Sequence, residues 1–113
     1  MRIEFPRGDS YECGFVLKDS RSGQTADEPF EEVYFTVKKN WTEKEYKFQK
    51  RMTTGGIVYD GDGHYTLHIA PEDTDGLTFG EYVCDLEFVK TGYKKTFNGV
   101  LKLEKEVTHR DNE

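Results

Sequence analysis

The 113-residue sequence lacks long apolar runs and has almost no helical periodicity. No stretch approaches the roughly 18 apolar residues that a membrane-spanning helix needs. The opening residues, MRIEFPRGDS, contain no apolar segment of the kind found in signal peptides. The sequence also has no low-complexity linker and no internal repeat. We therefore expect one domain over residues 1–107, with no membrane partner, followed by a disordered tail at residues 108–113.

Positive charge is in short supply, which bears on the choice of partner. Sixteen lysines and arginines face 22 aspartates and glutamates, so the net charge is −6. Because phosphate binding depends on lysine and arginine, nucleic acid is not the expected partner of the chain as a whole.

Aromatic residues are the material available for a core. The chain has eight phenylalanines and seven tyrosines but a single tryptophan. Each ring buries about 150–250 Å² when it is packed inside a protein. One core built largely on these rings is therefore expected.

Alternation of apolar and polar residues dominates the sequence, as in Tyr82, Cys84, Leu86 and Phe88. This period is typical of half-buried antiparallel strands. Turn signals separate the runs, among them Asp19 to Gly23, 60–63 and Asn98-Gly99. Strands are expected near residues 2–5, 10–18, 32–38, 45–52, 57–60, 63–70, 80–90 and 93–105. The sequence thus predicts an all-β, immunoglobulin-like antiparallel sandwich of seven or eight strands, with helical turns only at 41–45 and 71–77.

The segment PEDTDGLTFGEYVC resembles the corresponding region of immunoglobulin sandwiches. Tyr82 stands two residues before Cys84, where such domains place a tyrosine corner, a tyrosine whose hydroxyl bonds to upstream backbone. The resemblance implies that Cys13 is the counterpart of the first cysteine of those domains. It supports the architecture of a sandwich.

A second resemblance covers most of the chain. The order of an RGDS turn (residues 7–10), the strand VYFTVKK (33–39), the segment IAPEDT (69–74) and then GEY (80–82) is similar to small β-sandwich proteins of bacteriophages and prophages. These are related to the N-terminal domains of tail and baseplate proteins. The resemblance implies a non-enzymatic structural or connecting module, made in the bacterial cytoplasm, whose incorporation into a virion is left open.

Arg7, Gly8 and Asp9 begin the tetrapeptide RGDS, which is an integrin-binding motif in extracellular proteins. Gly8 can adopt a positive φ, and Asp9 can accept a hydrogen bond from backbone two residues further on. We expect a structural turn between two strands. An exported adhesion domain that uses this tripeptide is the alternative.

The two cysteines, Cys13 and Cys84, both fall on the inward side of their expected strands. A bridge between the sheets would close a loop of about 70 residues and stabilise the fold by about 4 kcal/mol. Cytosolic thiols remain reduced, however, so we favour two buried free thiols.

Two further patterns suggest metal sites. His64 and His68 lie four residues apart on a strand, hence roughly 13 Å apart, which is too far to share an ion without other ligands. The segment 60–63 (DGDG) lacks the third acidic ligand and the distal glutamate of a calcium loop. Exposed histidines and a hairpin turn are the expected interpretations, with no metal or cofactor.

The segment KKNWTEKEYKFQKR, residues 38–51, carries a net charge of +4, against −10 for the rest of the chain. Basic residues interleaved with aromatics are typical of solvated hairpins, of surfaces that dock an acidic partner, and of single-stranded nucleic-acid sites. The candidate partner contacts are Lys38, Lys39, Trp41, Lys44, Tyr46, Lys47, Lys50 and Arg51.

No phosphate-binding glycine loop and no nucleophile paired with a base stands out in the sequence. We therefore expect a protein that is not an enzyme and that acts through contacts with other phage structural proteins or with its own copies. The alternatives are the adhesion domain and a single-stranded nucleic-acid-binding module using the basic hairpin.

Overall fold

The computed structural model describes residues 1–17 and 30–105. The turn expected after Asp19, the end of the domain at residue 107 and the tail at residues 108–113 lie outside these ranges. The elements are β1 (Arg2–Pro6), β2 (Tyr11–Val16), β3 (Glu32–Lys38), β4 (Phe48–Arg51), β5 (Ile57–Gly61), β6 (His64–Ile69), α1 (Pro71–Thr74), β7 (Gly80–Lys90) and β8 (Tyr93–Glu104).

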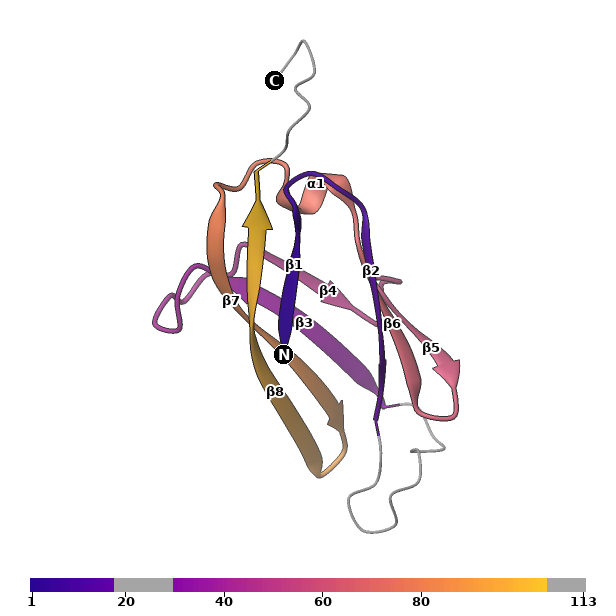
Figure 1. The fold of residues 1–113 in the computed structure, drawn as a ribbon. Coiled ribbons are helices and arrows are strands. Elements are labelled where there is room, and N and C mark those ends of the chain that lie inside the picture. The colour runs from indigo at the N-terminus through magenta and orange to yellow at the C-terminus, as the bar shows by residue number, and fades with distance from the viewer. Residues whose placement is uncertain (18–29, 106–113) are drawn as a thin grey trace.

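These strands form two facing sheets, in the orders β1-β8-β7-β3-β4 and β2-β6-β5 (Figure 1). The predicted all-β sandwich of seven or eight strands is therefore confirmed. Seven of the described strands pair in antiparallel fashion, whereas β1 runs parallel to β8. That parallel pair was not predicted, because alternation within a strand carries no information about its neighbour's direction.

The core lies between the two sheets and follows the predicted alternation. Val33, Phe35 and Val37 are 0% exposed, while the residues between them are half-buried on the outer face of the larger sheet. Phe88 is the centre of an aromatic cluster. Its ring contacts those of Phe15, Phe30, Tyr65 and Phe97, with centroids 5.3–6.0 Å apart. Rings from both sheets thus hold the sandwich together.

The Asn98-Gly99 pair is not a turn, which corrects the sequence-based interpretation. Both residues continue β8 and pair with Asp85 and Cys84 of β7. A Cβ on Gly99 would stand 2.4 Å from the backbone oxygen of Met1. The glycine is required at this position because the backbone of Met1 lies directly beside it, where a side chain would clash.

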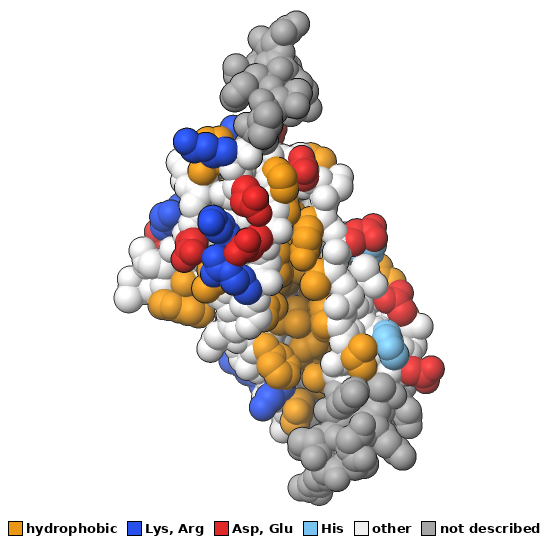
Figure 2. Space-filling view, viewed as in Figure 1, with side chains coloured by type: hydrophobic (Ala, Val, Ile, Leu, Met, Phe, Trp, Pro, Cys, Tyr) orange, Lys and Arg blue, Asp and Glu red, His pale blue; other side chains and the backbone are white. Residues whose placement is uncertain are grey.

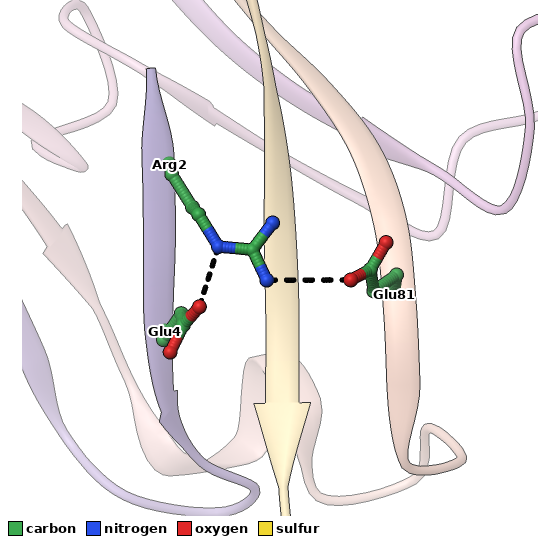
Figure 3. Close-up of polar contacts among 3 residues, drawn as sticks. All are labelled: Arg2, Glu4 and Glu81. Atoms are coloured by element: carbon green, nitrogen blue, oxygen red, sulfur yellow. Dashed lines mark hydrogen bonds and ion pairs between the residues drawn. The ribbon is translucent and has the colours of Figure 1, made fainter.

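Ion pairs on the outer face connect β1 to the rest of the larger sheet (Figure 3). The guanidinium of Arg2 bonds to Glu4 on its own strand and reaches across β8 to Glu81 of β7, at 3.3 Å. These carboxylates raise the pKa of Arg2. Because all three side chains are exposed, the contribution of the pairs to stability is small.

Of the two predicted helical turns, one forms. Residues 71–74 make the single helical turn α1. Ala70, the residue that precedes it, donates its backbone N–H to the carboxylate of Asp73 at 2.8 Å. Residues 41–45 form non-helical turns instead. This irregular segment continues to residue 47, so β4 begins at Phe48, three residues later than expected.

Candidate functional site

The RGDS segment is a tight turn between β1 and β2, packed against α1. Gly8 has a φ of +82°, and its N–H donates to the hydroxyl of Thr74 at 2.8 Å. Thr74 is 0% exposed. Asp9 N–H closes the turn by donating to Pro6 O at 3.2 Å. The turn is therefore fastened to the end of the sandwich by a partly buried hydrogen bond.

Arg7 is likewise held by its own protein. Its guanidinium donates to Leu77 O at 3.2 Å and lies 4.4 Å from the centroid of the Phe79 ring. An adhesion motif needs this guanidinium for a receptor. These contacts support the structural interpretation of Arg7, Gly8 and Asp9 over the adhesion alternative.

The tyrosine corner has the expected geometry. The hydroxyl of Tyr82 donates to Thr78 O at 2.8 Å and lies 3.0 Å from the hydroxyl of Thr78, with the ring 2% exposed. The ammonium of Lys39 covers the ring at 4.6 Å from its centroid. Tyr82 is thus a structural residue at the start of β7.

Both cysteines are free thiols, as favoured from the sequence. Cys84 is 2% exposed, and burial raises the pKa of its thiol to about 11. Cys13 is half-buried rather than buried, because β2 lies at the edge of the smaller sheet. A thiol with so high a pKa is a poor nucleophile. The burial of Cys84 makes it a core residue.

The two strand histidines make separate contacts, and the DGDG segment forms a turn. His68 Nδ1 is 3.1 Å from Glu12 Oε1, whereas His64 Nδ1 lies near Asp62 O at 3.0 Å. Positive φ angles at Gly61, Asp62 and Gly63 make the tight β5–β6 hairpin turn that was predicted. Within residues 1–17 and 30–105, no group of three or more His, Cys, Asp or Glu side chains could hold an ion.

Three of the eight predicted contact residues in segment 38–51 are engaged within the chain. Lys50 forms a 2.6 Å ion pair with Asp73, with both side chains less than one-fifth exposed. The guanidinium of Arg51 lies over Tyr34 at 5.2 Å from the ring centroid. Lys39 covers Tyr82, as described above. These three are structural contacts in this fold.

The other five predicted residues separate into two groups on different sides of the β3–β4 loop. Lys44, Tyr46 and Lys47 surround one shallow hollow, and the Tyr46 ring is 51% exposed. Lys38 and Trp41 line a second hollow on the outer face of the larger sheet. The sequence singled out these residues as one basic and aromatic segment, and the turns between residues 40 and 47 divide their side chains between the two hollows.

The second hollow, which we call the outer-face hollow, encloses about 210 Å³. It is lined by Thr36, Lys38, Trp41, Val83, Cys84, Asp85 and Asn98. A polar row, which we call the cross-strand row, crosses four paired strands here and consists of Gln49, Thr36, Asp85 and Asn98. The last three of these residues line the hollow. Gln49 Nε2 donates to Thr36 Oγ1 at 3.0 Å, which orients that end of the row.

Sequence reasoning missed this row. Alternation places Thr36 and Asp85 on the outer faces of their strands, but the register that sets them side by side is a tertiary property. Burial and the charge of Glu87 raise the pKa of Asp85, and the nearby Lys38 and Lys94 offset this only in part. No hydrogen bond or ion pair of the Asp85 side chain is found among the described residues.

The edge of β8 is a further unsatisfied feature. Pairing with β1 starts at Val100, whose N–H donates to Met1 O at 3.0 Å. Residues 94 and 96 present their backbone groups on the same side as Val100. No described strand pairs with β8 there. Tyr93 and Phe97, 47% and 39% exposed, lie along this part of the strand.

Figure 2 shows hydrophobic side chains gathered in a band on this open side of the sandwich, between the β1–β8 pair and β2. Among the described residues, the partly buried apolar side chains that β2 contributes to the core include Tyr11, Cys13 and Phe15. No helix in the described ranges is both long enough and apolar enough to span a membrane.

Comparison with known proteins shows the fold alone. No protein-family model matches the chain, and no curated protein matches it. Among solved structures, it is similar to the endo-β-1,4-mannanase from Thermotoga petrophila, with a TM-score of 0.56 and 18% identity. The match covers 92% of this chain and 18% of that enzyme. This chain therefore corresponds to only a small part of that enzyme.

Proposed function

We propose that this protein is a non-enzymatic structural or assembly module of the tail or baseplate type found in phages and prophages, acting through protein–protein contacts. The phage assignment is supported by the order of the sequence motifs, from the RGDS turn to the tyrosine corner. The docking activity is supported by the β8 edge. That edge is the single observation that carries the proposal.

The chemistry of the edge indicates its occupant. Backbone donors and acceptors at residues 94 and 96 can pair with one more strand, while Tyr93 and Phe97 offer apolar contacts on one side of it. Lys90 and Lys95 make the surroundings basic, whereas Lys94 is paired with Glu87 at 3.7 Å. An extended, acidic segment of a partner protein is therefore the expected occupant. A second copy fits less well, because antiparallel pairing of two β8 edges would bring their lysines together.

The group formed by Lys44, Tyr46 and Lys47 supplies a second exposed surface, of mixed charge because Glu43 and Glu45 line the same hollow. The three side chains are exposed, and no ion pair of either lysine is found in the part of the chain that the structure describes. Such rim charges mainly raise the rate of association and make it sensitive to salt.

A proline at residue 96 tests the β8 edge directly. Thr96→Pro removes a backbone donor that faces away from β7, and a proline with this orientation is tolerated on edge strands. Thr96→Ala keeps the donor and serves as the control. The probe is each protein encoded beside this gene, tested by pull-down with purified components at low and high salt.

We expect the native chain and Thr96→Ala to retain a tail or baseplate component, and Thr96→Pro to lose it. Equal capture of the component by Thr96→Ala and Thr96→Pro would show that the β8 edge is not part of the interface. If no such component is retained, and light scattering shows a monomer at every salt concentration, the proposed function is wrong.

A further inference from the structure

Trp41 is an unusual residue to leave in solvent. It is the chain's single tryptophan, and its side chain is 59% exposed. The turn that carries it is fixed by Asn40, whose Oδ1 accepts from Thr42 N–H at 3.1 Å, Thr42 Oγ1 at 2.8 Å and Glu43 N–H at 3.1 Å. A large apolar ring is therefore presented on a preorganised turn, so that binding to it would cost little ordering.

Beside this ring stand three polar side chains with free bonding capacity. Asp85 can accept hydrogen bonds, the Asn98 carboxamide can donate and accept, and Lys38 can donate. No hydrogen bond of these three side chains is found within residues 1–17 and 30–105. Their strands are about 4.8 Å apart, so successive groups of the row are separated by a distance comparable to the width of one sugar ring.

We propose that the outer-face hollow binds a neutral pyranose sugar, with the indole of Trp41 packed on the C–H face of the ring and the cross-strand row bonded to its hydroxyls. A pyranose has an apolar face and a polar rim, which match the two halves of the hollow. The hollow, at about 210 Å³, is smaller than the roughly 300–1,000 Å³ of sites that enclose drug-sized ligands. It therefore fits one ring of an oligosaccharide whose other rings remain in solvent.

Other ligand classes fit this hollow less well. An anion would meet Asp85 with Glu87 nearby, and a cation would meet Lys38. An apolar peptide would bury the carboxylate without offering it a donor. Burial already raises the pKa of Asp85, so the carboxylate costs stability where it stands. A hydroxyl that donates to Asp85 would compensate part of that cost.

Because Trp41 is the single tryptophan, its emission reports on this hollow alone. The probes are cellohexaose, mannohexaose and chitohexaose, with the acyclic polyol sorbitol as the control. We expect a saturable change in Trp41 emission with at least one hexasaccharide and none with sorbitol. Amide shifts in NMR spectra of the 13.2 kDa chain should be confined to residues around the cross-strand row.

Four variants complete the test by calorimetry. Trp41→Ala and Asp85→Ala should each weaken binding by at least about tenfold, the effect of losing one good contact. Tyr46→Ala should bind as the native chain does, because this equally exposed ring lines the other hollow. Thr96→Pro should also leave sugar binding intact, which separates this proposal from the docking function at β8.

The proposal is wrong if none of the three hexasaccharides gives a saturable signal up to its solubility limit. It is also wrong if Trp41→Ala binds as tightly as the native chain. A change in Trp41 emission caused by a partner protein, without any response to the sugars, would instead assign the hollow to a protein interface.

Discussion

The hydroxyl of Tyr82 donates a 2.8 Å hydrogen bond to the carbonyl oxygen of Thr78, four residues earlier in the chain. With the ring 2% exposed, this bond ties the connection after α1 to the first residues of β7. The same end of the sandwich holds the RGDS turn, through Thr74. Two partly buried hydrogen bonds therefore fix the end of the molecule at which three segments of chain converge.

Replacing Tyr82 by phenylalanine removes the hydroxyl and leaves the ring. We expect Tyr82→Phe to lower the free energy of unfolding by about 1 kcal/mol, because one buried hydrogen bond to the backbone is lost. Urea unfolding measures this change. The matched control is Tyr46→Phe, which alters an exposed ring and should stay within about 0.5 kcal/mol of the native chain. A Tyr82→Phe protein of native stability would show that the corner contributes nothing.

The strands and the tyrosine corner could be predicted from the sequence because both depend on local patterns. Alternation around Phe35 and Phe88 sets which face each residue occupies. The spacing of Tyr82 to Cys84 is similarly local. The parallel pairing of β1, in contrast, depends on which strand the N-terminal segment meets. Gly99 illustrates this: the sequence cannot show that a side chain at this position would clash, because the clash is with Met1, which the parallel pairing places beside it.

The RGDS turn provides the second prediction. Thr74→Val keeps the volume of the buried side chain but leaves Gly8 N–H without its acceptor. We expect this substitution to cost about 1–3 kcal/mol, the penalty of an unsatisfied buried donor. The measurement is again urea unfolding, with Thr96→Val as the exposed control, expected to change stability by no more than about 0.5 kcal/mol. If the two variants are equally stable, the turn is not anchored by Thr74.

The candidate sites were less predictable than the fold. Segment 38–51 was recognised as basic and aromatic, but its side chains divide between intramolecular contacts and two separate hollows. Charge along a sequence does not reveal which lysines are already paired, as Lys50 is with Asp73. The cross-strand row was invisible for a related reason, because Thr36 and Asp85 are 49 residues apart and meet only through the register of β3 with β7.

Thiol reactivity distinguishes the two cysteines. In the native protein we expect a thiol reagent such as DTNB to modify Cys13 at a measurable rate and to leave Cys84 unmodified. Cys84 is buried, and its raised pKa of about 11 keeps it protonated at mildly alkaline pH. In denaturant both thiols should react. The control is Cys13→Ser, which should show no reactive thiol until it unfolds. Rapid native reaction of that variant would contradict the burial of Cys84.

Asp85 and Glu32 should change stability in opposite directions with pH. Burial is the largest single influence on each carboxyl and by itself would raise its pKa. For Asp85 the charge of Glu87 adds to this increase, and the pKa remains raised. For Glu32 the hydrogen bonds from Thr53 and neighbouring backbone outweigh burial, and the pKa is lowered. The ionised form is therefore disfavoured by folding at Asp85 and favoured at Glu32.

For Asp85 the native state keeps its proton to higher pH than the unfolded state does. Stability therefore falls as pH rises from the ordinary aspartate pKa of 3.8 through the raised native pKa, and the penalty persists at neutral pH. We expect Asp85→Asn to be more stable than the native chain at neutral pH, with the difference disappearing below the ordinary pKa. Thermal unfolding across a pH series measures it.

Glu32→Gln is the mirror-image control on the neighbouring strand. Its native pKa lies below the ordinary glutamate value of 4.5, so the carboxylate stabilises the fold above that value and loses its contribution as pH falls through the lowered pKa. Glu32→Gln should accordingly be less stable than the native chain at neutral pH and approach it in acid. If Asp85→Asn were also destabilised at neutral pH, attraction to Lys38 and Lys94 would outweigh burial. Asp85 would then be a stabilising surface charge, and its cost to the fold could no longer support a binding role for the outer-face hollow.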